Sequence, residues 1–491
     1  MTTSQSGPVL EGSPWSGNIF NGEWVAARGG SIEIKEPANG KLLGRAGFAN
    51  AADVAAAAKL AASAQPAWAA TPVRERSEVL YRVAAYLEGN AEELAAFIAR
   101  ETGGTFLKGL HEVREAQHQA KVAAALALQP DGVTLPSTPG RLSFAKRVPL
   151  GVIGVISPFN FPLILSLRSV APALAVGNGV VLKPDAQTPV TGGVILALAF
   201  AEAGLPKGVL QMLPGSAEAG EALCTDPNVQ MISFTGSTAT GRRVGELAGK
   251  HLKKVALELG GKNSLIVLED TDLDLAAKNV AWGAYLHQGQ ICMATGRVLV
   301  HEKIVAALTA RLVEKANHLP VGDPAAGNVA LGPLINERQR DRVHTIVTQA
   351  VQEGAKLEAG GKYEGLFYQP TVLTGVRPSM RAFREEVFGP VANITAFASD
   401  EEAIALANDT EYGLSAAVLS RSIGRAMGIA ERLKAGLVHV NDQTVNDEVI
   451  NPFGGTGASG NHTSMGGPAD AAEYTQWRWM TVKDAAPPYP F

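Results

Sequence analysis

The hydrophobic and polar positions of this chain follow two different patterns. Residues from about 50 to 128 are rich in alanine, and their apolar side chains recur at helical spacing, as in SEVLYRVAAYLEGNAEELAAFIA. This spacing predicts several amphipathic helices. From about residue 151, short apolar runs such as GVIGVIS, NGVVLKP and VQMISFTG alternate with helix-length segments, and glycine, proline or asparagine bounds each run. That alternation predicts parallel strands joined by helices.

A second set of short apolar runs follows residue 292 and reads GRVLVHE, YQPTVLTG, NITAFAS, AAVLSR and GLVHVND. It predicts a second α/β domain over roughly residues 260–440. A length of 491 residues also favours two or three domains over one core. The turn-rich TLPSTPGRLSFAKRVP and the aromatic EYTQWRWMTV fit neither domain. The second of these could form an added strand that pairs with another chain.

Composition narrows the class of protein. Hydrophobic residues make up 46% and charged residues 18%, which is typical of a packed globular protein and not of a disordered one. The net charge is −4 and the densest basic runs are pairs, so we expect no nucleic-acid partner. Polar residues interrupt the most apolar stretch, 151–182, so we expect no membrane span.

The two cysteines and the first residues bear on location and metal content. Cys224 and Cys292 are too few for a four-ligand zinc site or for a secreted disulfide framework. The N-terminal MTTSQSGPVLEGSPWSG has neither the basic start nor the apolar core of a signal peptide. We therefore expect a reducing, cytoplasmic location and no metal.

Two glycine-rich segments are candidates for a phosphate-binding loop. GTGASG at residues 455–460 matches the dinucleotide fingerprint, but no predicted strand precedes it and no helix follows, so we interpret it as a flexible turn. FTGSTATG at residues 234–241 follows the strand-like VQMIS and opens a helix-like segment. Its backbone N–H groups could approach a phosphate, with Ser237 as a further donor. A simple strand-to-helix turn explains this segment equally well.

Cys292 lies on a glycine-bracketed turn in LHQGQICMATGR. A thiol with the ordinary pKa of about 8.5 is only slightly ionised at neutral pH, and lowering its pKa by about two units requires roughly 2.7 kcal/mol. We expect a helix N-terminus or backbone donors after Gly289 to provide this stabilisation. The alternative is an inert core cysteine, which is our interpretation of Cys224 in the helix-like GEALCT.

Glu258 and Asn160 are further candidates for chemistry. Glu258 ends the apolar run KKVALELGG, where partial burial would raise its pKa towards that of a general base. A salt bridge to Lys253 or Lys254 is the alternative. Asn160 stands between prolines in SPFNFP, and its amide could donate to an oxyanion or simply cap the turn.

Seven motifs occur together in one order: SPFNFP, LKPDAQTP, FTGSTATG, LELGGKN, HQGQICMATGR, EEVFGP and NPFGG. In this order they resemble the aldehyde dehydrogenase superfamily across essentially the whole chain. Phe159 in SPFNFP, together with LRSVAPALA, HVNDQTVN and the terminal YPF, resembles the benzaldehyde-type branch. The resemblance implies an α/β protein of three parts. These are a Rossmann-type, parallel-sheet NAD-binding domain (1–131 and 151–258), an α/β catalytic domain (259–440) with a substrate-tunnel loop (441–464), and a β oligomerisation arm (132–150 and 465–491).

The resemblance also implies a reaction. The Cys292 thiolate attacks an aldehyde, and the Asn160 amide and the Cys292 N–H hold the oxyanion. Hydride passes to the nicotinamide, and Glu258 activates the water that hydrolyses the thioester. The resemblance further implies a homodimer or homotetramer. A thiol hydrolase or acyltransferase without a nucleotide, and a non-catalytic protein on the same scaffold, are the alternatives from other classes.

NAD is the cofactor that the resemblance implies. It places Lys183 at the adenosine ribose, Glu386 at the nicotinamide ribose and Phe388 against the nicotinamide. Ala186 stands where many relatives carry an acidic residue that repels a 2′-phosphate, which leaves NADP as an alternative, although Asp185 is adjacent. The expected cofactor-binding residues are Ile156, Ser157, Pro158, Phe159, Lys183, Gly236, Ser237, Gly241, Leu259, Glu386 and Phe388.

The positions that align with the family's substrate tunnel are mostly apolar, which favours an aromatic aldehyde. The expected substrate pocket consists of Phe161, Leu165, Arg168, Leu286, Ile291, Met293 and Phe453. Succinate-semialdehyde relatives carry an arginine at the position of Arg168 and a second one where this chain has Leu286. We expect Arg168 to form a structural ion pair, and oxidation of an anionic semialdehyde or of a broad range of aliphatic aldehydes is the alternative. Gly457 replaces a lysine that many relatives have.

Overall fold

The computed structural model describes Leu10 and residues 14–491. The alanine-rich segment forms four helices, as its periodicity predicts. They are α1 (Ala51–Ala70), α2 (Val73–Gly89), α3 (Ala91–Thr102) and α4 (Phe106–Leu126). A capping box starts α1, because the Asn50 side chain accepts from Ala52 N and Asp53 N while the Asp53 carboxylate accepts from Asn50 N.

A seven-stranded sheet forms the centre of the first domain, in the order β11-β10-β7-β8-β9-β1-β2. The five strands from β11 to β9 are parallel, whereas β1 and β2 pair antiparallel at one edge. The strands are β1 (Asn18–Phe20), β2 (Trp24–Ala26), β7 (Val152–Ile156), β8 (Gly179–Lys183), β9 (Leu210–Met212), β10 (Val229–Thr235) and β11 (Lys254–Glu258). The crossover helices are α5 (Pro162–Ala175), α6 (Ile195–Glu202), α7 (Ala217–Thr225) and α8 (Thr238–Lys250), and a hairpin of β3 (Ser31–Lys35) and β4 (Leu42–Gly47) lies beside the sheet.

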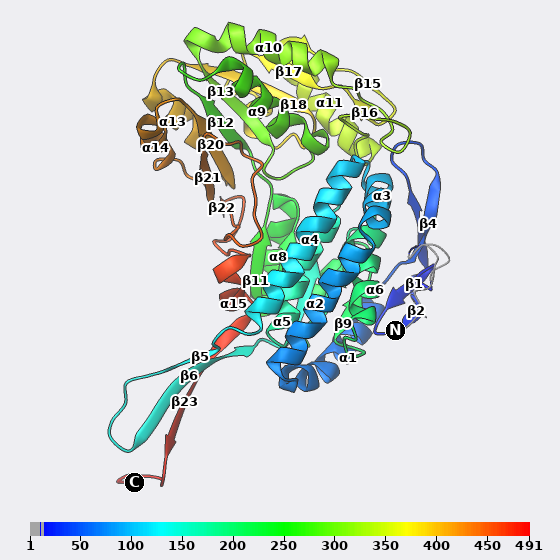
Figure 1. Ribbon diagram of the computed structural model, residues 1–491, viewed down its shortest axis with the longest axis vertical. Helices are drawn as coiled ribbons and strands as arrows, with labels where there is room; N and C mark the ends of the chain where they lie inside the picture. The colour runs from blue at the N-terminus through cyan, green and yellow to red at the C-terminus, as the bar shows by residue number, and fades with distance from the viewer. Residues whose placement is uncertain (1–9, 11–13) are drawn as a thin grey trace.

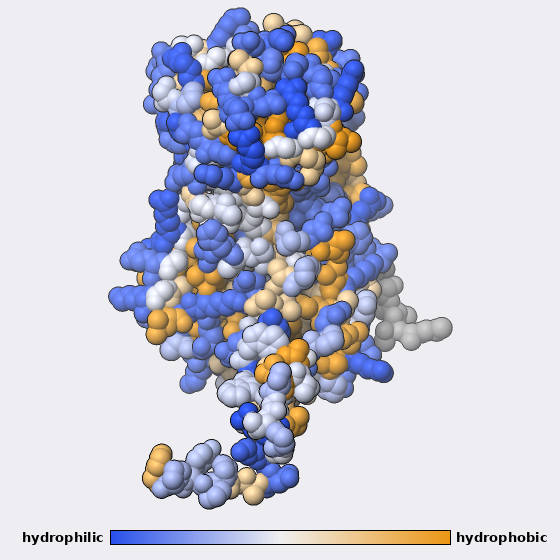
Figure 2. Space-filling model, turned by 90° about the vertical axis from the view of Figure 1, so that its left-hand side faces the viewer, coloured by the Kyte–Doolittle hydropathy of each residue, from blue (hydrophilic) through white to orange (hydrophobic). Residues whose placement is uncertain are grey.

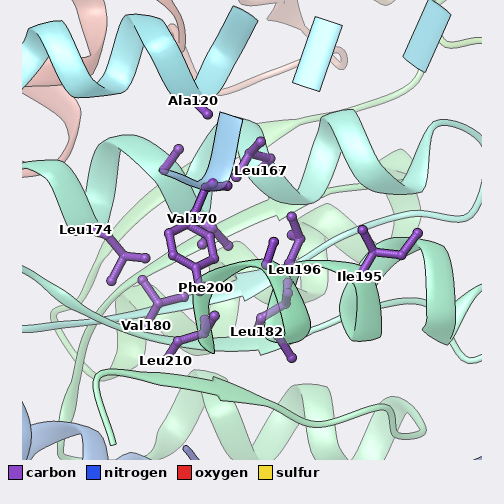
Figure 3. Packing of buried hydrophobic residues seen from close by; sticks show 14 of the residues in the cluster. Ala120, Leu167, Val170, Leu174, Val180, Leu182, Ile195, Leu196, Phe200 and Leu210 are labelled. Atoms are coloured by element: carbon purple, nitrogen blue, oxygen red, sulfur yellow. The ribbon is translucent and has the colours of Figure 1, made fainter. Parts of the chain in front are cut away.

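The sheet of this domain has a hydrophobic core on each face, and the larger one lies on the side of α4, α5 and α6. Figure 3 shows Leu167 and Val170 of α5 and Phe200 of α6 packed above Val180 and other strand residues. All four of these residues are fully buried. Burial of each large apolar side chain contributes about 1.5–3 kcal/mol, so this layer fixes the sheet whose strand ends carry the site.

A second seven-stranded sheet forms the centre of the other domain, in the order β14-β17-β18-β13-β12-β20-β21. Its strands are β12 (Asn263–Val267), β13 (Thr295–His301), β14 (Lys356–Ala359), β17 (Thr371–Thr374), β18 (Val391–Phe397), β20 (Ser415–Leu419) and β21 (Leu437–Val440). All of its pairs are parallel except that of β14 with β17. Its helices are α9 (Leu273–Tyr285), α10 (Val305–His318), α11 (Glu337–Gln352), α12 (Arg381–Arg384), α13 (Asp400–Asn408) and α14 (Ile423–Ala430), and two short β pairs are β15 (Tyr363–Glu364) with β16 (Phe367–Tyr368) and β19 (Tyr412–Gly413) with β22 (Thr456–Gly457).

A three-stranded β arm projects from the first domain (Figures 1 and 2). It consists of β5 (Gly132–Thr134), β6 (Arg141–Pro149) and β23 (Thr475–Lys483). The aromatic C-terminal segment is thus a strand, and it pairs with β6 of the same chain along its whole length. Residues 465–474, which include α15 (Asp470–Glu473), pack differently, because Met465 and Tyr474 lie in the core of the first domain.

The described helices, in Leu10 and residues 14–491, include none that combines the length and the hydropathy of a membrane span.

Candidate active site

The first sheet changes its winding direction between β7 and β10. The chain passes from β7 to β8 and β9 on one side, and then returns to place β10 and β11 on the other side. The carboxyl ends of the two strands at such a switch point form a ligand-binding crevice. Residues 157–160 follow β7, residues 236 and 237 follow β10, and Lys183 and Glu258 end the neighbouring strands β8 and β11. The candidate cofactor residues of this domain therefore share one edge of the sheet.

The N-terminus of α8 supports only part of the phosphate-binding expectation. Ser237 is the exposed N-cap, and its hydroxyl accepts from Thr240 N at 3.3 Å. The Gly236 N–H is not free for a phosphate, because it donates to the Glu258 carbonyl at 3.0 Å. Gly241 has a packing reason to be glycine, because a Cβ there would lie 2.2 Å from Leu259 Cδ2.

The other glycine segment, residues 455–460, has no helix after it and packs beside the end of β11. Gly460 bridges Glu258, the Ser459 carbonyl accepts from Leu259 N at 2.9 Å, and the Ser459 hydroxyl donates to the Gly260 carbonyl at 2.6 Å. The segment is therefore a turn, but it contains the short strand β22 and is held in place by these contacts, so it is not the flexible turn that was expected.

Lys183 and Glu386 approach the crevice from the two domains. No hydrogen bond or ion pair to the Lys183 ammonium occurs among the described residues, and burial lowers the pKa of this half-buried lysine. The Glu386 carboxylate accepts from Gly261 N at 3.1 Å, and burial raises its pKa to about 7. An ammonium without a partner and a carboxylate with spare acceptor capacity both suit the hydroxyl groups of a ribose.

Phe388 follows Glu386 in a strained loop. Its φ is +56°, a region that bulky side chains rarely adopt. The Gln339 side chain holds the loop by donating to the carbonyls of Val387 at 3.1 Å and Phe388 at 2.8 Å. The Phe388 ring meets the Phe159 ring edge to face, with 5.9 Å between the ring centroids. The two rings therefore join the domains across the crevice.

Glu258 is a buried carboxyl group without an internal partner. Its residue is 3% exposed, and neither carboxylate oxygen has a hydrogen-bond partner among the described residues. Burial raises its pKa well above the ordinary value, against the attraction of Arg168. The expected alternative of a salt bridge is wrong: Lys253 donates to the Val229 carbonyl at 2.6 Å, and Lys254 pairs with Glu473 at 3.1 Å. A buried carboxyl group with a raised pKa and no internal partner is a candidate general base.

Cys292 lies on a turn held by two side-chain amides, one from each domain. Asn160 Nδ2 donates to the Gln290 carbonyl at 2.9 Å, and Asn263 Nδ2 donates to the Cys292 carbonyl at 2.8 Å. The expected helix N-terminus is absent, because the chain passes from this turn directly into β13. The expected low pKa is also wrong for this structure: burial, and then the charges of Glu386 and Glu258, raise the pKa of the thiol to about 12. The Cys292 thiol is therefore protonated at neutral pH, and Glu258 is the candidate base for its proton.

Cys224 behaves as the inert alternative predicts. It is completely buried in α7, and burial raises its pKa to about 11. Cys292 is only partly buried, so it is the accessible one of the two thiols.

A cavity of about 1000 Å³ opens on the other side of Cys292. Asn160 lines it, and so does every residue expected for the substrate pocket, namely Phe161, Leu165, Arg168, Leu286, Ile291, Met293 and Phe453. Sequence reasoning missed the contributions of α4 and α9, which provide Phe106, Leu107, Trp282 and Tyr285. No signal in the sequence marks them: Leu107 and Trp282 are large apolar side chains that remain more than half exposed, which only the structure reveals.

The ion pair expected for Arg168 is present. Its guanidinium donates to the carboxylate of Asp447, and its Cζ lies 4.8 Å from the centroid of the Phe453 ring. Asp447 belongs to the loop of residues 441–464 and also lines the cavity.

The comparisons with known proteins agree with this architecture. The model of the aldehyde dehydrogenase family matches residues 24–480. This chain belongs to the aldehyde dehydrogenase family. It is 52% identical to a vanillin dehydrogenase from an Amycolatopsis species, over 98% of this chain and 99% of that protein. It is 50% identical to an NAD+-dependent benzaldehyde dehydrogenase from Pseudomonas putida, over 97% and 98% of the two chains.

Solved structures of aldehyde dehydrogenases have the same fold. A putative aldehyde dehydrogenase from Burkholderia cenocepacia superimposes with a TM-score of 0.93 at 37% identity, covering 97% of this chain and 99% of that one. Betaine aldehyde dehydrogenase from Staphylococcus aureus, solved with NAD+, gives 0.94 at 31% identity over 98% and 97%. The predicted family and α/β fold class are thus confirmed. Within Leu10 and residues 14–491, no cluster of three or more histidine, cysteine or acidic side chains is placed to hold a metal.

Proposed function

We propose that this aldehyde dehydrogenase oxidises an aromatic aldehyde to its carboxylic acid with NAD. The single observation that carries the proposal is the apolar cavity with Cys292 in its wall, lined by Phe161, Trp282 and Phe453. Such a lining suits a ring and gives few hydrogen bonds to a polar chain. The relatives named above as vanillin and benzaldehyde dehydrogenases support the same substrate class.

The crevice of the first sheet suits NAD, which accepts a hydride when it is bound. Lys183 and Glu386 would hold ribose hydroxyls, and Ser237 at the N-terminus of α8 would contact the pyrophosphate. Phe159 and Phe388 would contact the nicotinamide. The Asp185 carboxylate, which accepts from Gln187 N at 2.9 Å, is fixed two residues after Lys183 and disfavours the additional phosphate of NADP. The other members of this set are Ile156, Ser157, Pro158, Gly236, Gly241 and Leu259.

The side chains around Cys292 can divide the chemistry among them. Glu258 takes the thiol proton, and the resulting thiolate attacks the carbonyl carbon, whose electrons move to oxygen. The second N–H of the Asn160 amide, which is not used by Gln290, and the Cys292 N–H stabilise that oxyanion. After loss of hydride, Cys292 holds the acyl group as a thioester. Glu258 first releases the thiol proton to solvent and then deprotonates the water that attacks the acyl carbon. The C–S bond breaks, the Cys292 thiolate leaves and is protonated again, and the carboxylic acid is released.

The arm supports assembly into a homodimer or homotetramer. Trp477, Trp479 and Val482 on β23 are each at least half exposed, although they are large and apolar. Exposed apolar side chains grouped on one strand are typical of a surface that is covered by a partner. We propose that a second copy of the chain covers it. We retain in this proposal the boundaries expected above for the NAD-binding and catalytic domains, whereas residues 465–474, which were expected in the arm, pack on the first domain.

Turnover with a panel of aldehydes tests the proposal. The purified protein should form reduced nicotinamide, measured by absorbance, with NAD and benzaldehyde or vanillin, and more slowly with hexanal or succinate semialdehyde. Cys292→Ala should abolish the signal while NAD binding, measured by calorimetry, persists. Absence of any signal with all four aldehydes, combined with hydrolysis of a thioester or activated ester in the absence of NAD, would favour the thiol hydrolase instead.

A further inference from the structure

The inner wall of the cavity contains two buried cations, and each has a carboxylate of this chain as its partner. Lys108 of α4 pairs with Glu112 at 2.5 Å, and its ammonium lies 4.4 Å from the centroid of the Phe161 ring. Arg168 of α5 pairs with Asp447. Lys108, Arg168 and Asp447 all line the cavity. Each of the two positive charges in this wall is therefore already compensated by a carboxylate of the protein itself.

The two pairs differ in how their carboxylates are anchored. Glu112 is completely buried and accepts from Leu163 N at 2.8 Å, so it also caps the start of α5. Asp447 lies in the loop that follows β21, its side chain is 21% exposed, and the Arg168 side chain is 6% exposed. Arg168 is the only residue to which the described Asp447 side chain makes a hydrogen bond or an ion pair. Its carboxylate thus occupies the position that an anion from the cavity would otherwise take.

A buried guanidinium needs an anionic partner, because the loss of hydration is costly. If Asp447 were absent, a carboxylate on the substrate could provide that partner at Arg168. While Asp447 is present, the same carboxylate would find the guanidinium occupied and would meet a like charge beside it. An uncharged aldehyde does not meet this repulsion.

We propose that Asp447 is a specificity-determining residue. Its carboxylate compensates the positive charge of Arg168 and so excludes aldehydes that carry an additional anionic group. The inference rests on the proposed function, because it names which members of the aromatic aldehyde class the site rejects. In this proposal, the loop of residues 441–464 provides the part of the cavity wall that distinguishes an uncharged aromatic aldehyde from a carboxylated one.

The test compares two substrates of nearly equal shape, 4-formylbenzoate and its uncharged amide 4-formylbenzamide, and then the corresponding 3-substituted pair. In the parent protein, kcat/KM should favour the amides. Asp447→Ala should raise the ratio of acid to amide by about ten- to a hundredfold, which is the range for one charge-assisted hydrogen bond. The matched control is Glu448→Ala, which removes a carboxylate from the next position of the same loop, where the side chain is exposed and does not contact Arg168. It should leave the ratio unchanged.

Two further variants separate specificity from structural damage. In Asp447→Ala/Arg168→Met the gain for the acids should disappear, because the cation that binds them is gone. If Asp447→Ala does not fold, Asp447→Asn keeps an acceptor for Arg168 and should move the ratio in the same direction by a smaller factor. A ratio that stays within about twofold of the parent in the folded Asp447 variants, or an equal change in Glu448→Ala, overturns the proposal.

The failure of the proposed function would look different. It would appear in the parent protein as absence of NAD-dependent turnover with both benzaldehyde and the amides, whereas failure of this inference requires turnover with an unchanged ratio. A parent protein that already prefers the formylbenzoates would overturn the inference and leave aromatic aldehyde oxidation intact.

Discussion

The pKa of Cys292 leads to a quantitative prediction about its reactivity without cofactor. With the pKa raised to about 12, roughly one thiol in ten thousand is ionised at pH 8, against about a quarter for a thiol with the ordinary pKa of about 8.5. The more basic thiolate is intrinsically more nucleophilic, by about 40-fold for this difference. The net effect is that Cys292 should react about 60-fold more slowly than an ordinary cysteine at pH 8.

The assay follows thiol–disulfide exchange with bis(2-hydroxyethyl) disulfide, which is small and uncharged, and measures modified protein by mass spectrometry. Cys224→Ala leaves a single thiol. Because the thiol pKa lies above the accessible range, the rate should rise about tenfold per pH unit from about pH 7.5 to 10 without a plateau. Glu386→Gln should increase the rate, since the Glu386 carboxylate is the largest charge contribution that raises the thiol pKa. Its own pKa of about 7 keeps it ionised over this range.

A plateau below about pH 9 would refute this reasoning, because it would show a thiol pKa near the ordinary value. So would an unchanged or slower rate in Glu386→Gln. The matched control is Glu385→Gln, which neutralises the neighbouring carboxylate that instead pairs with Arg381 at 2.6 Å and should leave the rate unchanged.

Three other expectations concern the base, the α8 contact and the arm. Glu258→Gln should give a burst of reduced NAD close to one equivalent and then stall as a thioester, which quenched-flow and mass spectrometry detect. Gly241→Ala should lower stability by about 1–3 kcal/mol in urea unfolding, because its methyl group overlaps Leu259, whereas Gly249→Ala in the open part of α8 should stabilise by about 0.5–1 kcal/mol. Trp477→Glu should lower the molar mass in sedimentation by breaking a subunit contact.

Each of these has an outcome that contradicts it. Steady turnover of Glu258→Gln at the parent rate would place the base elsewhere. Equal unfolding free energies for the two glycine variants would show that the 2.2 Å overlap with Leu259 relaxes at no cost. An unchanged mass for Trp477→Glu would remove the exposed face of β23 from the subunit interface.

The sequence motifs identified which side chains lie in the site, but they did not identify the ion-pair partners and pKa values of those side chains. Glu258, Asn160 and Lys183 could be found because each ends a strand or follows one, and a strand end bounded by glycine or proline is visible in the sequence. The partner of Arg168 could not be found, because Asp447 lies 279 positions away in a loop without periodicity. The pKa of Cys292 could not be found either, since it depends on burial and on carboxylates from two domains.

The β arm is a second example of a feature that the sequence alone predicts only in part. An aromatic C-terminal strand was predicted from its composition, which left pairing with another chain open, whereas β6 of the same chain pairs with it. Strand propensity depends on local residues, but strand pairing depends on which edges the rest of the fold leaves open. Likewise, the cavity residues of α4 and α9 became recognisable only when two helices from different domains were found to face the same space.

The position of Cys292 explains why the turn between the two domains must be so tight. The carboxyl-end rule applies to the first sheet, but Cys292 precedes β13 and so lies at the amino edge of the second sheet. The chain from Glu258 crosses between these edges in Gly260 and Gly261. A Cβ at Gly260 would lie 2.5 Å from Glu386 Oε2, and one at Gly261 would lie 2.6 Å from the Cys292 carbonyl oxygen. Any side chain in this turn would therefore separate the base, the nucleophile and the ribose-binding carboxylate that the reaction needs together.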